Sequence, residues 1–232
     1  MSRPIAIPQP QANAATLFLA KVFNWMAVGL GLTGLTAYLV AQSPAALAII
    51  FGNRLVFYGL IAAEIGLVIA IASRVQRLPR QAASLLFATY AILNGLTLAS
   101  VFLLYTGVSV ASTFFVSGGM FAGAAVYGFV TRKDLTSFGA FLRMGLFGLI
   151  LASLVNLFLG NPMMSWVISG IGVLVFTGLA AYDVQKLYQL GASSILGDER
   201  TVHGAAIQGA LQLYLDFVNL FLMLLHFLGD RR

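Results

Sequence analysis

Four ionisable side chains lie inside stretches of the chain that are apolar enough to cross a membrane. They are Glu64, Arg143, Asp183 and Asp216. Hydrocarbon does not solvate ions, and inserting one charge at mid-membrane costs roughly 3 kcal/mol, so such residues usually face a bundle interior or a water-filled path. Carboxyl groups there exchange protons and attract hard cations such as calcium, and an arginine neutralises them. These residues therefore indicate a site that handles protons or cations.

Asp183 and Asp216 are the pair that we expect to meet. Asp183 lies near the end of one apolar stretch, and Asp216 lies in the first half of the next. Sequential spans run antiparallel, and at 1.5 Å per residue both carboxyl groups fall roughly 5–15 Å from the same membrane surface. Two buried carboxyl groups this close share a proton and titrate as a coupled pair, and once ionised they suit calcium. The alternative is a static, structural pair.

Polar residues also follow one face of the last apolar stretch. Gln208, Gln212, Asp216 and Asn219 are spaced by three or four residues, which places them on one side of a helix. Such a stripe must face protein or water and not lipid. The last helix is therefore expected to be central, with these residues lining a pore. The alternative is that the stripe only makes hydrogen bonds between helices.

The composition requires lipid as the solvent of this chain. Of its 232 residues, 60% are hydrophobic and 9% are charged, with a mean hydropathy of +0.94. An ordinary soluble domain is about 25% charged, which is far more than this chain carries. The chain has no cysteine and two histidines, so disulfides, thiolate metal sites and a histidine-only zinc site are excluded. We expect no cofactor, and no nucleic-acid partner, because a net charge of +6 in such a chain usually sets membrane topology.

The elements that must position these residues are seven apolar spans of about 20 residues each, the length that crosses hydrocarbon. They are expected at residues 20–42, 54–74, 83–105, 108–130, 138–160, 163–187 and 206–228. The fold class is therefore an all-α membrane protein, a seven-transmembrane-helix bundle. Residues 1–19 are expected to be a flexible tail and 20–232 a single domain, in which the one sizeable loop is 191–204.

Glycine and charge patterns add two expectations. Gly119 and Gly123 form a GxxxG pair, which favours close packing between helices. Lysine and arginine gather in the N-terminal segment and in every second loop, which predicts a cytoplasmic N-terminus. Compactness and the absence of organelle signals favour a bacterial inner membrane.

Two motifs are similar to one known family. AYDVQKL at 181–187 and LQLYLDFVNLFLMLLHFLG at 211–229 resemble the Bax inhibitor-1 family, including its bacterial members. The resemblance covers the chain from about residue 20 to the end. It implies a bundle of seven helices with the last helix surrounded by the other six.

The resemblance also implies a function. Members of this family include pH-sensitive calcium leaks controlled by two aspartates, which here would be Asp183 and Asp216. It implies an acid in the second helix, matched by Glu64, and an arginine near the end of that helix that locks the aspartates, for which Arg74 is the nearest candidate. Arg143 is a further candidate partner at comparable depth. Calcium and protons would then be the ions handled.

Two other functions remain open. The chain is a candidate regulator that modulates a membrane protease or a stress response through a membrane-protein partner, without transport. Two membrane aspartates also superficially resemble an intramembrane aspartyl protease, but Asp216 lacks the GxGD context of those enzymes. The sequence carries no P-loop, HExxH, GxSxG or dinucleotide fingerprint, so we expect no enzymatic activity.

Overall fold

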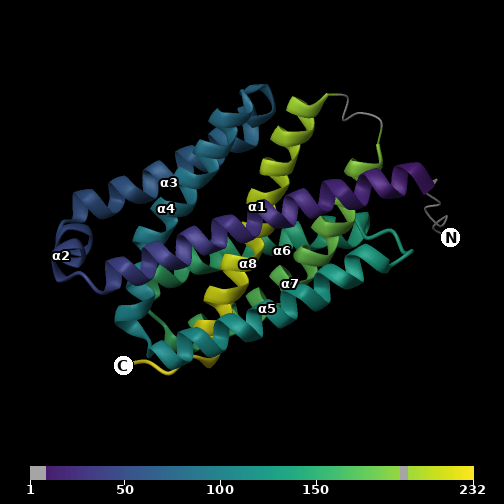
Figure 1. The fold of residues 1–232 in the computed structure, drawn as a ribbon. Coiled ribbons are helices and arrows are strands. Elements are labelled where there is room, and N and C mark those ends of the chain that lie inside the picture. The colour runs from purple at the N-terminus through teal and green to yellow at the C-terminus, as the bar shows by residue number, and fades with distance from the viewer. Residues whose placement is uncertain (1–8, 194–197) are drawn as a thin grey trace. The chain divides into compact units, whose positions relative to one another are not determined.

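The structure is a computed structural model that describes residues 9–193 and 198–232. Its helices are α1 (Gln9–Ala41), α2 (Pro44–Gly52), α3 (Arg54–Arg74), the 3₁₀ turn η1 (Val75–Arg77), α4 (Arg80–Leu104), α5 (Gly107–Val130), α6 (Thr136–Leu159), α7 (Pro162–Ala192) and α8 (Glu199–Leu228) (Figure 1). Among the described residues, seven helices are long and apolar enough to cross a membrane, which confirms the predicted seven-helix membrane fold.

Three boundaries differ from the prediction. The first helix begins at Gln9, so residues 9–19 of the predicted tail are helical, while residues 1–8 lie outside the described residues. The joint after the first span contains α2, a helix too short to cross the membrane. The predicted loop at 191–204 is shorter, because α7 continues to Ala192 and α8 begins at Glu199.

Polar caps account for where several helices begin. Ser43 caps α2 through a hydrogen bond from the Ala46 N–H, and Asn53 caps α3 through one from the Leu55 N–H. Each satisfies a main-chain donor that has no partner within its helix. α6 ends at Gly160, whose positive φ of 61° suits a residue without a side chain.

Aspartates also accept main-chain hydrogen bonds at the starts of α6 and α8. Asp134 accepts a hydrogen bond from the Thr136 N–H, and Asp198 accepts one from the Thr201 N–H, each at 2.9 Å. Hydrogen bonds from the side chain and main chain of these threonines hold the pKa of both exposed carboxyl groups below its ordinary value. Both aspartates therefore remain ionised at neutral pH.

The described helices divide into two compact units. The first unit holds residues up to Thr16, 108–192 and 215–230, and the second holds 17–107, 198–214 and the last two residues. Within the second unit α3 packs along α4, and within the first α6 packs along α7 (Figure 1). α8 contributes residues to both units, and half of its most apolar stretch is buried, the largest share among the seven spans. This burial agrees with the expectation of a central last helix.

Candidate functional site

The structure brings the two predicted aspartates together within the first unit. Asp183 of α7 is 4% exposed and Asp216 of α8 is 7% exposed. Their carboxyl groups lie within hydrogen-bonding reach of each other. Because a carboxylate has no hydrogen to donate, a hydrogen bond between them needs one proton on one of the two groups. Two buried acids this close favour such sharing of a proton over ionisation of both.

One oxygen of the pair has no hydrogen-bond partner among the described residues. Asp216 Oδ2 is buried and has no hydrogen bond within the described part of the chain. A buried polar atom without a partner usually marks strain, a functional group or a site for water or an ion. No group of three or more metal-ligating side chains occurs among the described residues, so the pair offers a passing calcium ion only two carboxyl groups. Further oxygens would have to come from carbonyl groups or water.

The residues beside Asp183 fix the turn of α7 that carries it. The Tyr182 ring packs on Gly139 of α6, where a Cβ would lie 2.3 Å from a ring carbon. The Ala181 carbonyl packs on Gly128 of α5, where a Cβ would lie 2.0 Å from its oxygen. α5 and α6 therefore approach α7 closely at the two residues before Asp183, at positions where only glycine fits.

Gln185 fastens this turn to the loop between α5 and α6. It is 5% exposed, its Nε2 donates to the Lys133 carbonyl, and its Oε1 accepts from the Leu135 N–H, both at 2.8 Å. One side chain thus satisfies a main-chain donor and a main-chain acceptor of a loop that has no regular secondary structure. The sequence predicted no role for Gln185, although it lies only two residues after Asp183.

We expect the substitution Gln185→Leu to destabilise the protein by about 2 kcal/mol, because both loop groups lose their partner. Gln189→Leu, one turn later on α7 at a half-buried position, is the matched control and should change little. Denaturation in mixed micelles, followed by circular dichroism, measures the difference. Equal stability of the two variants would contradict the role given to Gln185.

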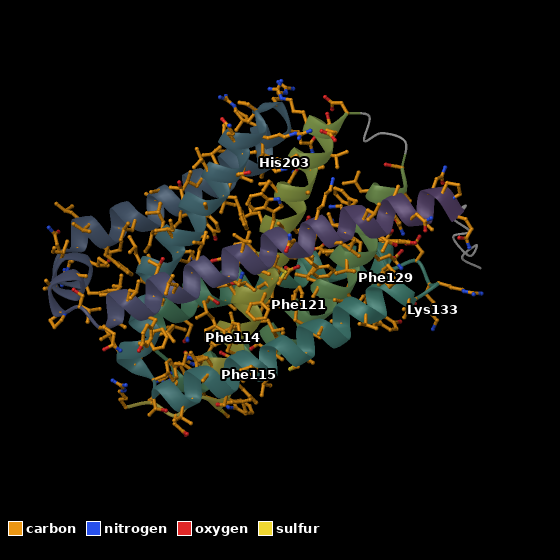
Figure 2. All side chains as sticks on the ribbon, in the orientation of Figure 1. Phe114, Phe115, Phe121, Phe129, Lys133 and His203 are labelled. Carbon is orange, nitrogen blue, oxygen red and sulfur yellow. The ribbon has the colours of Figure 1, made fainter. Side chains whose placement is uncertain are left out.

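Aromatic rings cover the residue that follows Asp216. Phe217 lies edge-on to Phe114 at 5.4 Å and to Phe121 at 5.7 Å between ring centres. Both partners belong to α5 (Figure 2). This packing holds the second half of α8 against α5 and keeps apolar surface beside the carboxyl pair.

The two candidate arginines differ in position. The Arg143 guanidinium lies over the Tyr182 ring, 5.1 Å from its centre, and so neighbours the aspartate pair through that ring. Arg74 is exposed at the end of α3, in the second unit. The proposed role of either arginine in locking the aspartates stays a prediction.

Glu64 joins a hydrogen-bonded network in the second unit. Its carboxylate accepts from Asn94 Nδ2 at 3.1 Å and from Thr97 Oγ1 at 2.9 Å, both on α4. Tyr214 of α8 donates to Asn94 Oδ1 at 2.8 Å, and its hydroxyl lies 2.7 Å from that of Thr33 on α1. The network therefore connects four helices, and it satisfies a carboxylate that hydrocarbon would not solvate.

Tyr214→Phe tests this network. Removing the hydroxyl removes the hydrogen bond to Asn94 Oδ1 and the one shared with Thr33 Oγ1. We therefore expect the free energy of unfolding to fall by about 1–2 kcal/mol. Tyr58→Phe, at an exposed ring of α3, removes a hydroxyl outside the network and should be neutral. Denaturation in mixed micelles compares the two, and a Tyr214→Phe variant as stable as its control would argue against the network.

The predicted stripe on α8 separates into different contacts. Gln208 accepts from Gln76 Nε2 at 2.7 Å and donates to the Ala72 carbonyl, so it fastens α8 to the end of α3. Asn219 donates to the Leu215 carbonyl of its own helix, and Gln212 is half-buried. A pore lined by the stripe stays a prediction.

Comparison with known proteins agrees with these features. A family model described as "Inhibitor of apoptosis-promoting Bax1" matches residues 15–232. Inner membrane protein YbhL of Escherichia coli strain K12 is 46% identical over 230 residues, which cover 99% of this chain and 98% of that protein. A protein of Borreliella burgdorferi is 44% identical over 216 residues, 93% of this chain and 92% of its own length. Another, of Deinococcus radiodurans, is 43% identical over 224 residues, 97% of this chain and 94% of its own length. The chain therefore belongs to the Bax inhibitor-1 family of membrane proteins.

Proposed function

We propose that this protein is a pH-sensitive calcium leak gated by Asp183 and Asp216, with the N-terminus in the cytoplasm. The observation that carries the proposal is the close approach of two carboxyl groups that are both almost fully buried. The bacterial inner membrane is the proposed location, because the name of the related E. coli protein gives that location.

The shared proton is the proposed lock. While it lies between the two carboxyl groups, it holds α7 and α8 together at the level of the pair. As the pH of the adjoining compartment rises, the proton leaves and the two carboxylates repel each other. The ionised pair, with the unpartnered Asp216 Oδ2, can then attract a hydrated calcium ion in passage. The leak is therefore expected to increase with pH.

Calcium uptake into proteoliposomes tests the proposal. Wild type is compared between pH 5 and pH 8 with a variant carrying both Asp183→Asn and Asp216→Asn. Asp230→Asn is the matched control, because it removes an exposed carboxylate near the C-terminus. We expect a pH-dependent leak in wild type and in the control, and a flat profile in the double variant.

The other outcomes assign other functions. If folded wild type passes no calcium at any pH, the leak is wrong, and regulation of a membrane-protein partner without transport takes its place. The proposal includes no enzymatic step. Cleavage of a membrane-embedded peptide that Asp216→Asn abolishes would replace it with an aspartyl protease.

A further inference from the structure

Basic residues of the second unit gather where four of its elements meet. Lys21 of α1, Arg77 of η1, Arg80 of α4 and Arg200 of α8 are all exposed, and we call them the basic cluster. Lys21 and Arg80 act electrostatically on His203 of α8, whose ring lies edge-on to Trp25, 5.6 Å between centres. Figure 2 labels His203 at the end of α8 where these elements meet.

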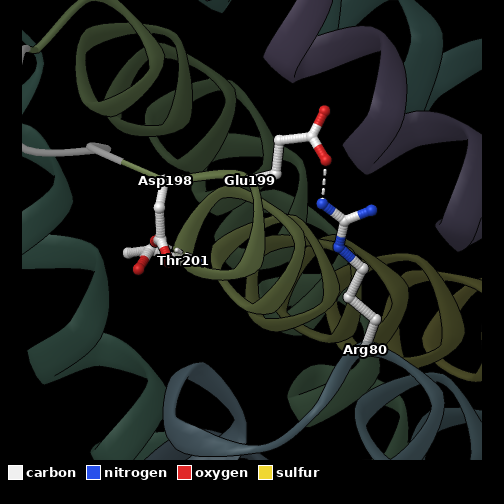
Figure 3. Close-up of polar contacts among 4 residues, drawn as sticks. All are labelled: Arg80, Asp198, Glu199 and Thr201. Carbon is white, nitrogen blue, oxygen red and sulfur yellow. Dashed lines mark hydrogen bonds and ion pairs between the residues drawn. The ribbon is translucent and has the colours of Figure 1, made fainter.

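Two members of the basic cluster are already held by the protein. Arg80 forms an ion pair with Glu199, which Figure 3 shows beside the Asp198–Thr201 cap. Arg200 donates to the main-chain carbonyls of Arg77 and Leu78, so it fixes the turn before α4 to the first turn of α8. These contacts build a rigid frame.

The other two members have unused donors. The side chains of Lys21 and Arg77 make no hydrogen bond or ion pair with any residue in the described ranges. Lys21 nevertheless lies within electrostatic range of Glu199, and the Arg77 carbonyl is bound by Arg200. Both therefore flank the first turn of α8. Among the described residues, the carboxylates of Asp198 and Glu199 interact with members of the cluster. Four positive charges against these two carboxylates leave an excess of two positive charges.

The position of the cluster along the spans indicates what kind of ligand it meets. Arg77 ends one span, Arg80 begins the next, and Arg200 is the second residue of the last. Lys21 lies 20 residues before the end of α1, about 30 Å along the helix axis, which is the thickness of the hydrocarbon. All four side chains therefore fall at the level of lipid headgroups, and Trp25 has the amphipathic ring typical of that level.

We propose that the basic cluster binds the phosphate of an anionic phospholipid headgroup, with Lys21 and Arg77 as its direct donors. Arg80 and Arg200 act as positioning residues that hold the frame. A lipid phosphate carries one negative charge, which offsets part of this excess, and an arginine guanidinium matches its oxygens. The membrane surface supplies phosphates at this depth, and in an anionic lipid no cationic group on the same headgroup neutralises that charge.

Lipid retention measured by native mass spectrometry tests the proposal. The intact protein in a neutral detergent is mixed with phosphatidylglycerol or with phosphatidylcholine. Wild type is compared with a variant carrying Lys21→Gln and Arg77→Gln. A variant carrying Arg132→Gln and Lys133→Gln removes the same charge from the loop between α5 and α6 of the first unit. We expect the first variant to retain phosphatidylglycerol roughly tenfold to thirtyfold more weakly, with phosphatidylcholine unchanged and the loop variant close to wild type.

Each other result overturns the proposal. If the cluster variant retains phosphatidylglycerol as well as wild type does, Lys21 and Arg77 do not bind the headgroup. An equal loss in the loop variant would assign the effect to net charge alone. If inorganic phosphate or a glutamate-rich peptide displaces phosphatidylglycerol at equal concentration, the cluster binds a soluble anion or an acidic segment instead. Size-exclusion chromatography checks that the variants are folded. We expect them to fold, because the substituted side chains make no hydrogen bond or ion pair with the described residues.

Discussion

Gly128→Ala is expected to destabilise the protein by about 3 kcal/mol, the upper end of the usual range for overpacking. A Cβ at this position would lie 2.0 Å from the carbonyl oxygen of Ala181 and 2.8 Å from its carbon. Both are backbone atoms, so no rotamer change relieves the overlap, and α5 must move away from α7. Because Asp183 lies two residues after Ala181, the same movement displaces the turn that carries the aspartate pair.

Gly123→Ala is the matched control on the same helix. A Cβ there would meet nothing within 4 Å, so the substitution should gain up to about 1 kcal/mol of helix propensity. Unfolding by SDS in mixed micelles, followed by tryptophan fluorescence, gives both values. A Gly128→Ala variant at least as stable as Gly123→Ala would show that α5 and α7 do not approach as closely as described.

This contrast also shows what a sequence pattern leaves open. The GxxxG spacing predicted close packing at Gly119 and Gly123, and for packing within this chain that prediction is wrong, because a Cβ at either position would meet no described atom within 4 Å. Close approaches occur instead at other glycines, among them Gly128 and Gly139. Spacing identifies glycines on one helix face, but it cannot say which face meets a neighbour, because that depends on how the helices are rotated.

The long spans were predictable because each has enough consecutive apolar residues to cross a membrane. α2 was missed because a nine-residue helix gives too little hydrophobic signal, although Ser43 and Pro44 are typical of a helix start. The meeting of Asp183 and Asp216 was predictable because the two spans are sequential and antiparallel and place both groups at comparable depth. For elements that are not sequential, depth does not say which helices or loops lie side by side, which is why the bonds of Gln185 and Glu64 emerged only from the structure.

Asp216→Asn is expected to remove most of the pH dependence of the protein, in stability and in calcium leak, while it keeps the bond between α7 and α8. The asparagine amide carries its own hydrogens, so it donates to the Asp183 carboxylate without the proton that wild type must bind. Wild type should lose stability as the pH rises and the shared proton leaves. The variant has no such proton to lose, and its stability should change much less between pH 5 and pH 8.

Asp216→Leu separates this effect from the loss of the bond itself. Leucine has no donor, so Asp183 loses the partner at position 216 in a site where it is 4% exposed. We expect Asp216→Leu to be about 2 kcal/mol less stable than Asp216→Asn at pH 8, where Asp183 must stay ionised or take up a proton at unfavourable pH. The gap should narrow at pH 5, where Asp183 carries its own proton. Denaturation at both pH values measures the four free energies. A gap that does not change with pH would mean that the pair is held by packing alone, and a proton could not then act as its lock.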